Sequence, residues 1–201
     1  MGRVTRWLER HAPRNAAALG EPAGPKMISE AEGRLGVSFP QQMWTWLLTH
    51  NGVRRKEDHF GGSSEARANC FLPSGWHLLS VEEIVAVYEW RTSMSAMQPS
   101  PHPTPECLGW HRNWIPFAVE SDWLYGRFVD ASTGVLGSWS DGDLNELGTH
   151  DDLAEYFHDL ADEMHLYGKV EDGELPGRNP GRIPRSTAPP RTRVRDRLTA
   201  R

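Results

Sequence analysis

Apolar residues recur at helical spacing over residues 153–164. The spacing i, i+3, i+4, i+7 and i+11 places side chains on one face of an α-helix. The residues that match this spacing are Leu153, Tyr156, Phe157, Leu160 and Met164. Two aspartates precede this stripe, where the positive end of the helix dipole favours them, and Gly168 follows it. The pattern predicts an amphipathic helix that ends at Gly168 and buries one face.

The clearest helix start in the sequence lies at Ser80. Ser80 and Glu83 have the spacing of a capping box, in which each side chain accepts a hydrogen bond from the other residue's backbone N–H. Apolar residues then recur on one face, at Val81, Ile84, Val85 and Tyr88. A helix that packs against the core is therefore predicted from Ser80 onward.

Three shorter helices are predicted nearer the N-terminus, over residues 5–11, 29–36 and 40–50. The second opens with Ser29 and Glu32, which again have capping-box spacing. The third opens at a proline, which the first helical turn tolerates, and stops at an Asn-Gly pair.

Three short runs typical of strands lie between residues 114 and 140. They are "WIPFAV" (114–119), "LYGRFVD" (124–130) and "VLGSWS" (135–140), with a further short strand expected over 69–72. Short turns between consecutive runs are typical of an antiparallel meander. Because helices flank a consecutive block of strands, the sequence favours the α+β class over a βαβ repeat.

Composition indicates a globular protein with excess chain at one end. The chain has 201 residues, of which 38% are apolar, and a formal net charge of −5. Its two cysteines, Cys70 and Cys107, could pair but do not make a disulfide framework, so a reducing compartment is the simpler interpretation. No apolar run approaches the length of a membrane span or a signal core, and we expect a cytoplasmic protein.

The charge is unevenly distributed. Residues 176–201 hold eight arginines and one aspartate, a formal charge of +7, so the remainder carries −12. This segment has five prolines and no aromatic residue, a composition that cannot bury enough apolar area to offset chain entropy. We expect one α+β domain over 1–172 and a disordered basic tail over 173–201. The tail is either simply solvated, which we favour, or contacts a polyanion or the acidic body.

The sequence contains no motif for catalysis or cofactor binding. It lacks a phosphate-binding glycine loop and a G-x-S-x-G frame. The spacing of His102, Cys107 and His111 fits no established zinc pattern. His158 and Asp159 lie on an acidic helix face that could hold a cation, as in a metal-dependent hydrolase, but solvated acidic faces are far commoner. We expect no catalytic residue, no metal and no cofactor.

Nine tryptophans require explanation in a chain of this size. Most fall on predicted elements and are interpreted as core residues. Trp76 and Trp123 fall on turns, where a tryptophan either closes the end of a sheet or anchors a binding partner. The sequence favours neither alternative.

An ordered set of short motifs resembles the SUKH superfamily. The motifs are I-x-x-A-E-x-x-L-G, a proline followed by a helix and Asn-Gly, "FLPSG" followed by "LLSVEEI", "WIPFA", and "VD" followed by a glycine. The matching residues are Ile28, Ala31, Glu32, Leu35, Gly36, Pro40, Asn51, Gly52, Leu72, Pro73, Ser80, Glu83, Ile84, Trp114, Ile115, Pro116 and Asp130. They span roughly residues 26–167. The chain departs from the pattern at Phe39, where leucine is usual, at 121–123, where a glycine-rich turn is usual, and in its basic tail.

The resemblance implies an α+β fold with a central antiparallel sheet and no enzyme activity. The superfamily includes yeast-type cell-wall-synthesis regulators and many bacterial immunity proteins that bind and neutralise a toxin, often a nuclease. We therefore expect a protein-binding domain whose partner is a basic toxin domain, with no nucleic acid bound directly and no membrane. The alternative is a regulatory or scaffold protein with other cytoplasmic partners.

Acidic residues cluster in the turns of the expected meander. Glu120 ends the first strand, Asp122 lies in the loop after it, and Asp141 and Asp143 follow the third strand. Alternate loops of a meander emerge at the same end of the sheet, so these residues would form one acidic rim around Trp123. For any single residue the sequence favours an ordinary turn residue, since aspartate favours turns, whereas for the set it favours the rim. The expected partner-binding residues are Glu120, Asp122, Trp123, Asp141, Asp143 and Trp76.

Overall fold

The computed structural model describes residues 1–54, 71–72, 75–97, 109–120, 122–140, 144–170, 173 and 175. Its helices are α1 (Gly2–His11), α2 (Pro13–Ala18), α3 (Pro25–Leu35), α4 (Gln41–Leu47), α6 (Val81–Met97) and α7 (Leu153–Tyr167). Its strands are β1 (His77–Leu78), β2 (Trp114–Val119), β3 (Gly126–Asp130), β4 (Leu136–Trp139) and β5 (Glu146–His150). None of the helices in these ranges combines the length and the apolar character needed to cross a bilayer.

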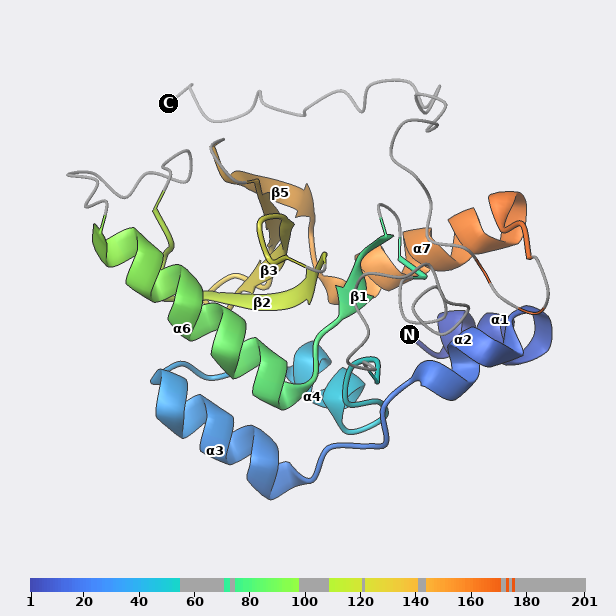
Figure 1. The fold of residues 1–201 in the computed structure, drawn as a ribbon, viewed down its shortest axis with the longest axis horizontal. Coiled ribbons are helices and arrows are strands. Elements are labelled where there is room, and N and C mark those ends of the chain that lie inside the picture. The colour runs from blue at the N-terminus through green and yellow to red at the C-terminus, as the bar shows by residue number, and fades with distance from the viewer. Residues whose placement is uncertain are drawn as a thin grey trace, which may run out of the picture.

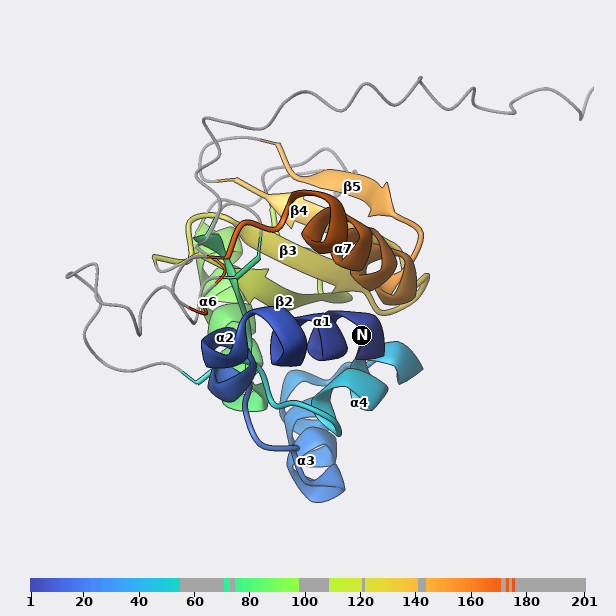
Figure 2. The same ribbon diagram turned by 90° about the vertical axis from the view of Figure 1, so that its right-hand side faces the viewer.

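The strands form one antiparallel sheet in the order β1-β2-β3-β4-β5 (Figure 1 and Figure 2). Val119 pairs with Gly126 and Gly126 with Trp139, so each strand lies beside its neighbour in sequence. Helices flank the sheet (Figure 2). The predicted α+β class and antiparallel meander are therefore confirmed.

Two strand predictions differ from the structure. Residues 71–72 are not in a strand, and the strand that pairs with β2 is His77–Leu78, further along the chain. The prediction also missed β5, whose sequence "ELGTH" lacks apolar alternation. Both errors arise because the strand lacks a period-2 pattern. Strand β1 is only two residues long, and β5 is a partly exposed edge strand.

The two faces of the sheet carry separate aromatic layers. On the α6 side, the Trp110 ring makes edge contacts with Trp114, Phe128 and Trp139 at centroid distances of 5.8, 5.5 and 5.3 Å. The guanidinium of Arg91 on α6 lies 5.3 Å from the same ring centroid. Such pairs add to the free energy of burying apolar area.

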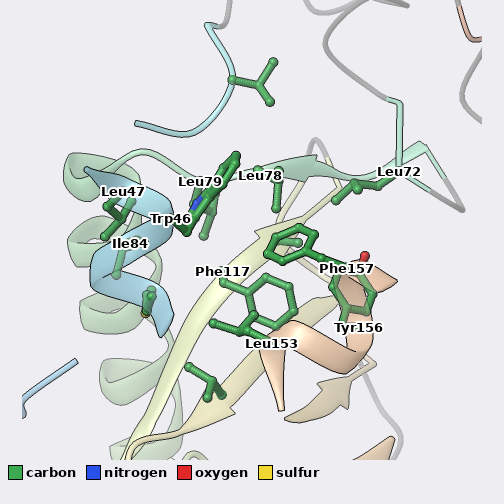
Figure 3. Close-up of a cluster of buried hydrophobic side chains, with 14 of the residues drawn as sticks. Trp46, Leu47, Leu72, Leu78, Leu79, Ile84, Phe117, Leu153, Tyr156 and Phe157 are labelled. Carbon is green, nitrogen blue, oxygen red and sulfur yellow. The ribbon is translucent and has the colours of Figure 1, made fainter. Parts of the chain in front are cut away.

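The opposite face packs against α7 and α4 (Figure 3). Phe117 of β2 meets Tyr156 of α7 at 5.5 Å between ring centroids, and Phe157 meets Trp46 of α4 at 5.5 Å. The stripe predicted on the last helix is buried at all five of its positions. This layer fixes α7 across the sheet, with α1 packed beside it (Figure 2).

The capping box predicted at the start of α6 is confirmed. The Ser80 N–H donates to Glu83 Oε2 at 2.9 Å, and the Glu83 N–H donates to Ser80 Oγ at 3.2 Å. The helix predicted to end at Gly168 is also confirmed, because α7 ends at Tyr167 with Gly168 as its cap.

The capping box predicted at Ser29 is wrong. Helix α3 begins at Pro25, so Ser29 lies inside it. Glu32 instead accepts hydrogen bonds from the Phe39 N–H at 2.6 Å and from the Trp44 indole N–H at 2.9 Å. Proline is pre-organised for the first helical position, which explains the earlier start. Glu32 therefore joins α3 to the segment that leads into α4.

The N-terminal region is more helical than predicted. The expected helix over 5–11 begins at Gly2, and α2 was not expected at all. The buried amide of Asn15 in α2 accepts from the Leu175 N–H at 2.7 Å and donates to the Leu175 carbonyl at 3.5 Å. The chain is thus bonded to α2 as far as Leu175, three residues past the expected domain end. Residues 176–201, most of the expected tail, lie outside the described residues.

Candidate functional site

The sheet topology brings four of the six predicted partner-binding residues to one end of the sheet. Trp76 directly precedes β1, and His77 pairs with Val119 at the end of β2. Glu120, Asp122 and Trp123 lie in the β2–β3 connection, between the paired residues Val119 and Gly126. We call this region the loop end of the sheet.

Asp141 and Asp143 lie outside the described residues. The residues flanking them, Ser140 and Leu144, follow β4 and precede β5. Since Trp139 pairs with Gly126, the β4–β5 connection leaves the sheet at the loop end as well. The proposed position of these two carboxylates in an acidic rim remains a prediction.

Glu120 and Asp122 form a carboxyl pair within the β2–β3 loop. Partial burial, followed by a side-chain hydrogen bond to Asp122 and the negative charge of Asp122, raises the pKa of Glu120 to about 7. Asp122 is exposed, and its Oδ1 accepts from the Leu124 N–H at 3.2 Å. The bond to Leu124 is that of an ordinary turn aspartate, whereas the hydrogen bond to Glu120 contributes to the raised pKa of the Glu120 carboxyl.

Trp123 is half-buried, with a left-handed backbone and two contacts that hold it. Its backbone φ is 66°, a left-handed conformation rare for a bulky residue. Its carbonyl accepts from the Trp139 indole N–H at 3.1 Å, and its ring meets Trp90 of α6 at 6.1 Å, edge to face. Trp123 therefore closes this end of the α6-side aromatic layer, and the part of its ring that remains exposed is presented by a fixed loop.

Trp76 lies on the other side of the sheet end. It follows Gly75, which has a φ of 72° and donates its N–H to the Leu72 carbonyl at 3.2 Å. Its half-buried ring packs against the core, and the guanidinium of Arg127 on β3 lies 5.2 Å from its centroid. Trp76 thus has both a packing role and an exposed surface. Closing the end of the sheet and anchoring a partner are therefore compatible roles for this side chain.

Two exposed apolar residues at the loop end were missed from the sequence. Leu144 is 61% exposed and Tyr125 is 39% exposed. Tyr125 is fixed by its carbonyl, which accepts from the Glu120 N–H at 3.1 Å. The signal that could have found Leu144 is an apolar residue within the otherwise polar run "SDGDLNE". The loop end therefore combines carboxylates, half-buried indoles and exposed apolar side chains, a mixture typical of protein-binding surfaces.

The residues considered for a metal site do not assemble one where the structure describes them. Within the described ranges, no three or more His, Cys, Asp or Glu side chains come together as ligands. His102, Cys107 and Cys70 lie outside those ranges, and His111 packs on Trp114 at 5.9 Å. On α7, His158 and Asp162 bond to the guanidinium of Arg3.

Comparison with known proteins identifies the fold family. The model of the SMI1 / KNR4 family (SUKH-1) matches residues 22–163, more than half of the chain. The chain belongs to this family. The resemblance noted from the sequence motifs is thereby confirmed. No curated protein matches the chain significantly. The SUKH-1 match includes α3 through most of α7 and all the described loop-end residues, but it begins after α1 and α2.

Proposed function

We propose that this SUKH-1 protein is a non-catalytic binding domain that neutralises a toxin by covering it, with the loop end of the sheet as the contact surface. The observation that carries this proposal is the grouping of Glu120, Asp122, Trp123, Tyr125 and Leu144 on loops fixed by the sheet. Family membership supports the binding role, because immunity proteins are one of the known roles within the superfamily.

The charge of the body supports a basic partner. The chain before residue 176 carries a formal charge of −12. A nuclease toxin presents a basic cleft to phosphates, so an acidic protein would associate with it quickly at low ionic strength. The loop-end carboxylates would lie opposite lysines or arginines of that cleft.

The Glu120–Asp122 pair fits a cationic partner for a second reason. In the free protein, burial followed by the hydrogen bond to Asp122 and its charge raises the pKa of Glu120 to about 7, so that this carboxyl holds a proton for part of the time at neutral pH. A lysine or arginine placed against the pair would favour the ionised form and release that proton. The pair therefore gains an interaction only when a cation arrives.

Trp123 and Trp76 would supply the anchors of the interface. Their rings are held by the core on one side and exposed on the other, so little side-chain entropy is lost when a partner covers them. The backbone carbonyl of Trp123 is already bonded to Trp139, which fixes the loop before binding.

The experiment that tests this function is co-expression of the chain with the toxin encoded beside its gene in the native host. The toxin should stop growth when expressed alone, and the chain should restore it. Asp122→Lys should reduce the protection, whereas Glu30→Lys should not, because Glu30 lies exposed on α3, where it pairs with Lys26 at 3.7 Å. Growth arrest that persists with wild-type chain present and folded, for every neighbouring toxin, would refute the neutralising role.

A further inference from the structure

Arg127 of β3 is held by aromatic rings rather than by a carboxylate. Its guanidinium carbon lies 5.2 Å from the ring centroid of Trp76 and 5.3 Å from that of Tyr156. Its Nη1 donates to Thr149 Oγ1 at 3.5 Å, a long hydrogen bond to a neutral group. Within the described part of the chain, no Asp or Glu lies within ion-pair distance of Arg127.

Arg91 also lies over aromatic rings, whereas other arginines of the protein pair with carboxylates. The body carries an excess of acidic residues, and Arg3 and Arg34 both form ion pairs, with Asp162 and Glu89. Arginine stacks on aromatic faces while leaving the edge of its planar fork available, and that fork matches a carboxylate in two parallel hydrogen bonds. Arg127 is half-buried and its ring contacts fix its orientation. The geometry is that of a cation kept in place for an anion supplied from outside.

Tyr156 provides a second, independent indication. Its side chain is 4% exposed, and its hydroxyl has no hydrogen-bond partner among the described residues. A buried hydroxyl without a partner has lost its hydrogen bonds to water without replacing them, which destabilises the fold. The ring that carries it is the one beneath the Arg127 guanidinium, so an unused donor and an unpaired cation occur together.

We propose that Arg127 binds a carboxylate of the protein partner at the loop end, with the hydroxyls of Thr149 and Tyr156 as neighbouring donors. This inference rests on the proposed function and adds to it. Arg127 follows Gly126, which pairs with Val119, so it lies close to the acidic loop. The partner surface must then present an acidic side chain beside its basic ones, and a uniformly basic surface would fit less well.

A carboxylate fits the site better than a phosphate. One guanidinium matches the single negative charge of a carboxylate. A phosphate group carries about −1.5 to −2 at pH 7. The excess would lie near Asp159, Glu155 and Asp151, whose charges all reach the neighbouring His150. Burial, followed by the charge of Arg127, lowers the pKa of His150, so at pH 7 that imidazole is neutral and adds no positive charge.

The site can be tested without the partner by titrating the full chain with sodium acetate against sodium chloride at equal ionic strength. The readouts are the NMR resonances of the Arg127 Nε–H and the Trp76 indole N–H. Acetate should shift both saturably, whereas chloride should not. Arg127→Met should abolish the shift of the Trp76 resonance, and Arg112→Met, at an exposed arginine outside the sheet, should leave it intact. If Arg127→Met does not fold, Arg127→Lys serves, with binding weakened at least fivefold.

A second variant separates the hydroxyl from general packing. Tyr156→Phe should keep or raise the melting temperature, because it removes an unpaired buried hydroxyl, and should weaken acetate binding at least twofold. The proposal is overturned if acetate gives no saturable shift, if Arg127→Met leaves the Trp76 shift unchanged, or if inorganic phosphate binds more than tenfold tighter than acetate. Intact acetate binding in a chain that protects against no toxin would refute the proposed function and leave the anion site standing.

Discussion

The indole N–H of Trp139 donates a hydrogen bond to the backbone carbonyl of Trp123 at 3.1 Å. Trp139 ends β4 and is 1% exposed, whereas Trp123 lies in the β2–β3 loop with a backbone φ of 66°. This bond ties a surface loop to the core and helps to hold an unfavourable backbone conformation. A loop fixed in this way loses little conformational entropy on binding, which is what a recognition surface requires.

The left-handed conformation of Trp123 predicts an unusual order of stabilities. Trp123→Ala should lower the free energy of unfolding by about 2 kcal/mol, because it removes a half-buried ring and leaves a Cβ in a strained conformation. Trp123→Gly should lower it by only about 1 kcal/mol, because glycine adopts positive φ without that strain. Urea unfolding measures both. A glycine variant less stable than the alanine variant would mean that the loop is not left-handed at residue 123.

The Glu120–Asp122 pair predicts a pH dependence with a definite sign. The folded-state pKa of Glu120, about 7, lies above its ordinary value of 4.5, so the folded protein binds more protons than the unfolded chain in this interval. The contribution of Glu120 to stability is therefore most favourable below pH 4.5 and is lost as the pH rises through 7. The side chain introduced by Glu120→Gln cannot ionise. The melting temperature of this variant minus that of wild type should therefore be larger at pH 8 than at pH 5.

The control for this measurement is Glu30→Gln, whose melting difference from wild type should not change over the same pH interval. A pH titration of the Glu120 carboxyl by ¹³C NMR measures its folded-state pKa directly. A titration midpoint near 4.5 would contradict the raised pKa of Glu120 and its close pairing with Asp122.

The bonds of Glu32 predict a strong effect at a residue that looks like surface. Its carboxylate holds the Phe39 N–H and the Trp44 indole N–H. Glu32→Ala leaves both donors without this partner and should lower the free energy of unfolding by about 2–3 kcal/mol. Glu30→Ala, two residues away on the exposed face of α3, should change it by less than about 0.5 kcal/mol. Equal effects of the two substitutions in urea unfolding would refute this role.

The bonds between Asn15 and Leu175 predict where the chain can be shortened. A chain ending at residue 176 should keep the wild-type melting temperature. A chain ending at residue 172 loses Leu175 and leaves the buried Asn15 amide without these partners, at a cost of about 1–3 kcal/mol. That corresponds to a drop of several degrees for a domain of this size. Identical melting of the two chains would show that Leu175 contributes nothing to the fold.

Local patterns predicted the elements that carry their own signals. The capping box of Ser80 and Glu83 and the apolar stripe of α7 need only residues within one helix, and both predictions were confirmed. Ser29 and Glu32 show the limit of this reasoning, because the same spacing occurred inside a helix that Pro25 had already started. Strand β5 had no periodic pattern to detect, since an edge strand buries little on either face.

The candidate site was predictable only as far as topology follows from the order of strands. A meander places Glu120 and Asp122 at one sheet end, and the sequence led to that placement. The pairing of Arg127 with Trp76, fifty-one positions earlier in the chain, depends on β1 lying beside β2, which the sequence did not reveal. The burial that raises the pKa of Glu120 likewise arises from the folded loop and cannot be predicted from the adjacent residues in the sequence.

The central claim is that a toxin partner covers the loop end of the sheet, and hydrogen–deuterium exchange of the chain with and without that partner tests it most directly. Binding should slow exchange at residues 119–126 and 76–78, while α3 keeps the exchange of the free protein. The Asp122→Lys variant should need a higher partner concentration for the same protection, and added salt should reduce that difference. Protection confined to α3, or to α1 and α2, with unchanged exchange at 119–126, would contradict the claim.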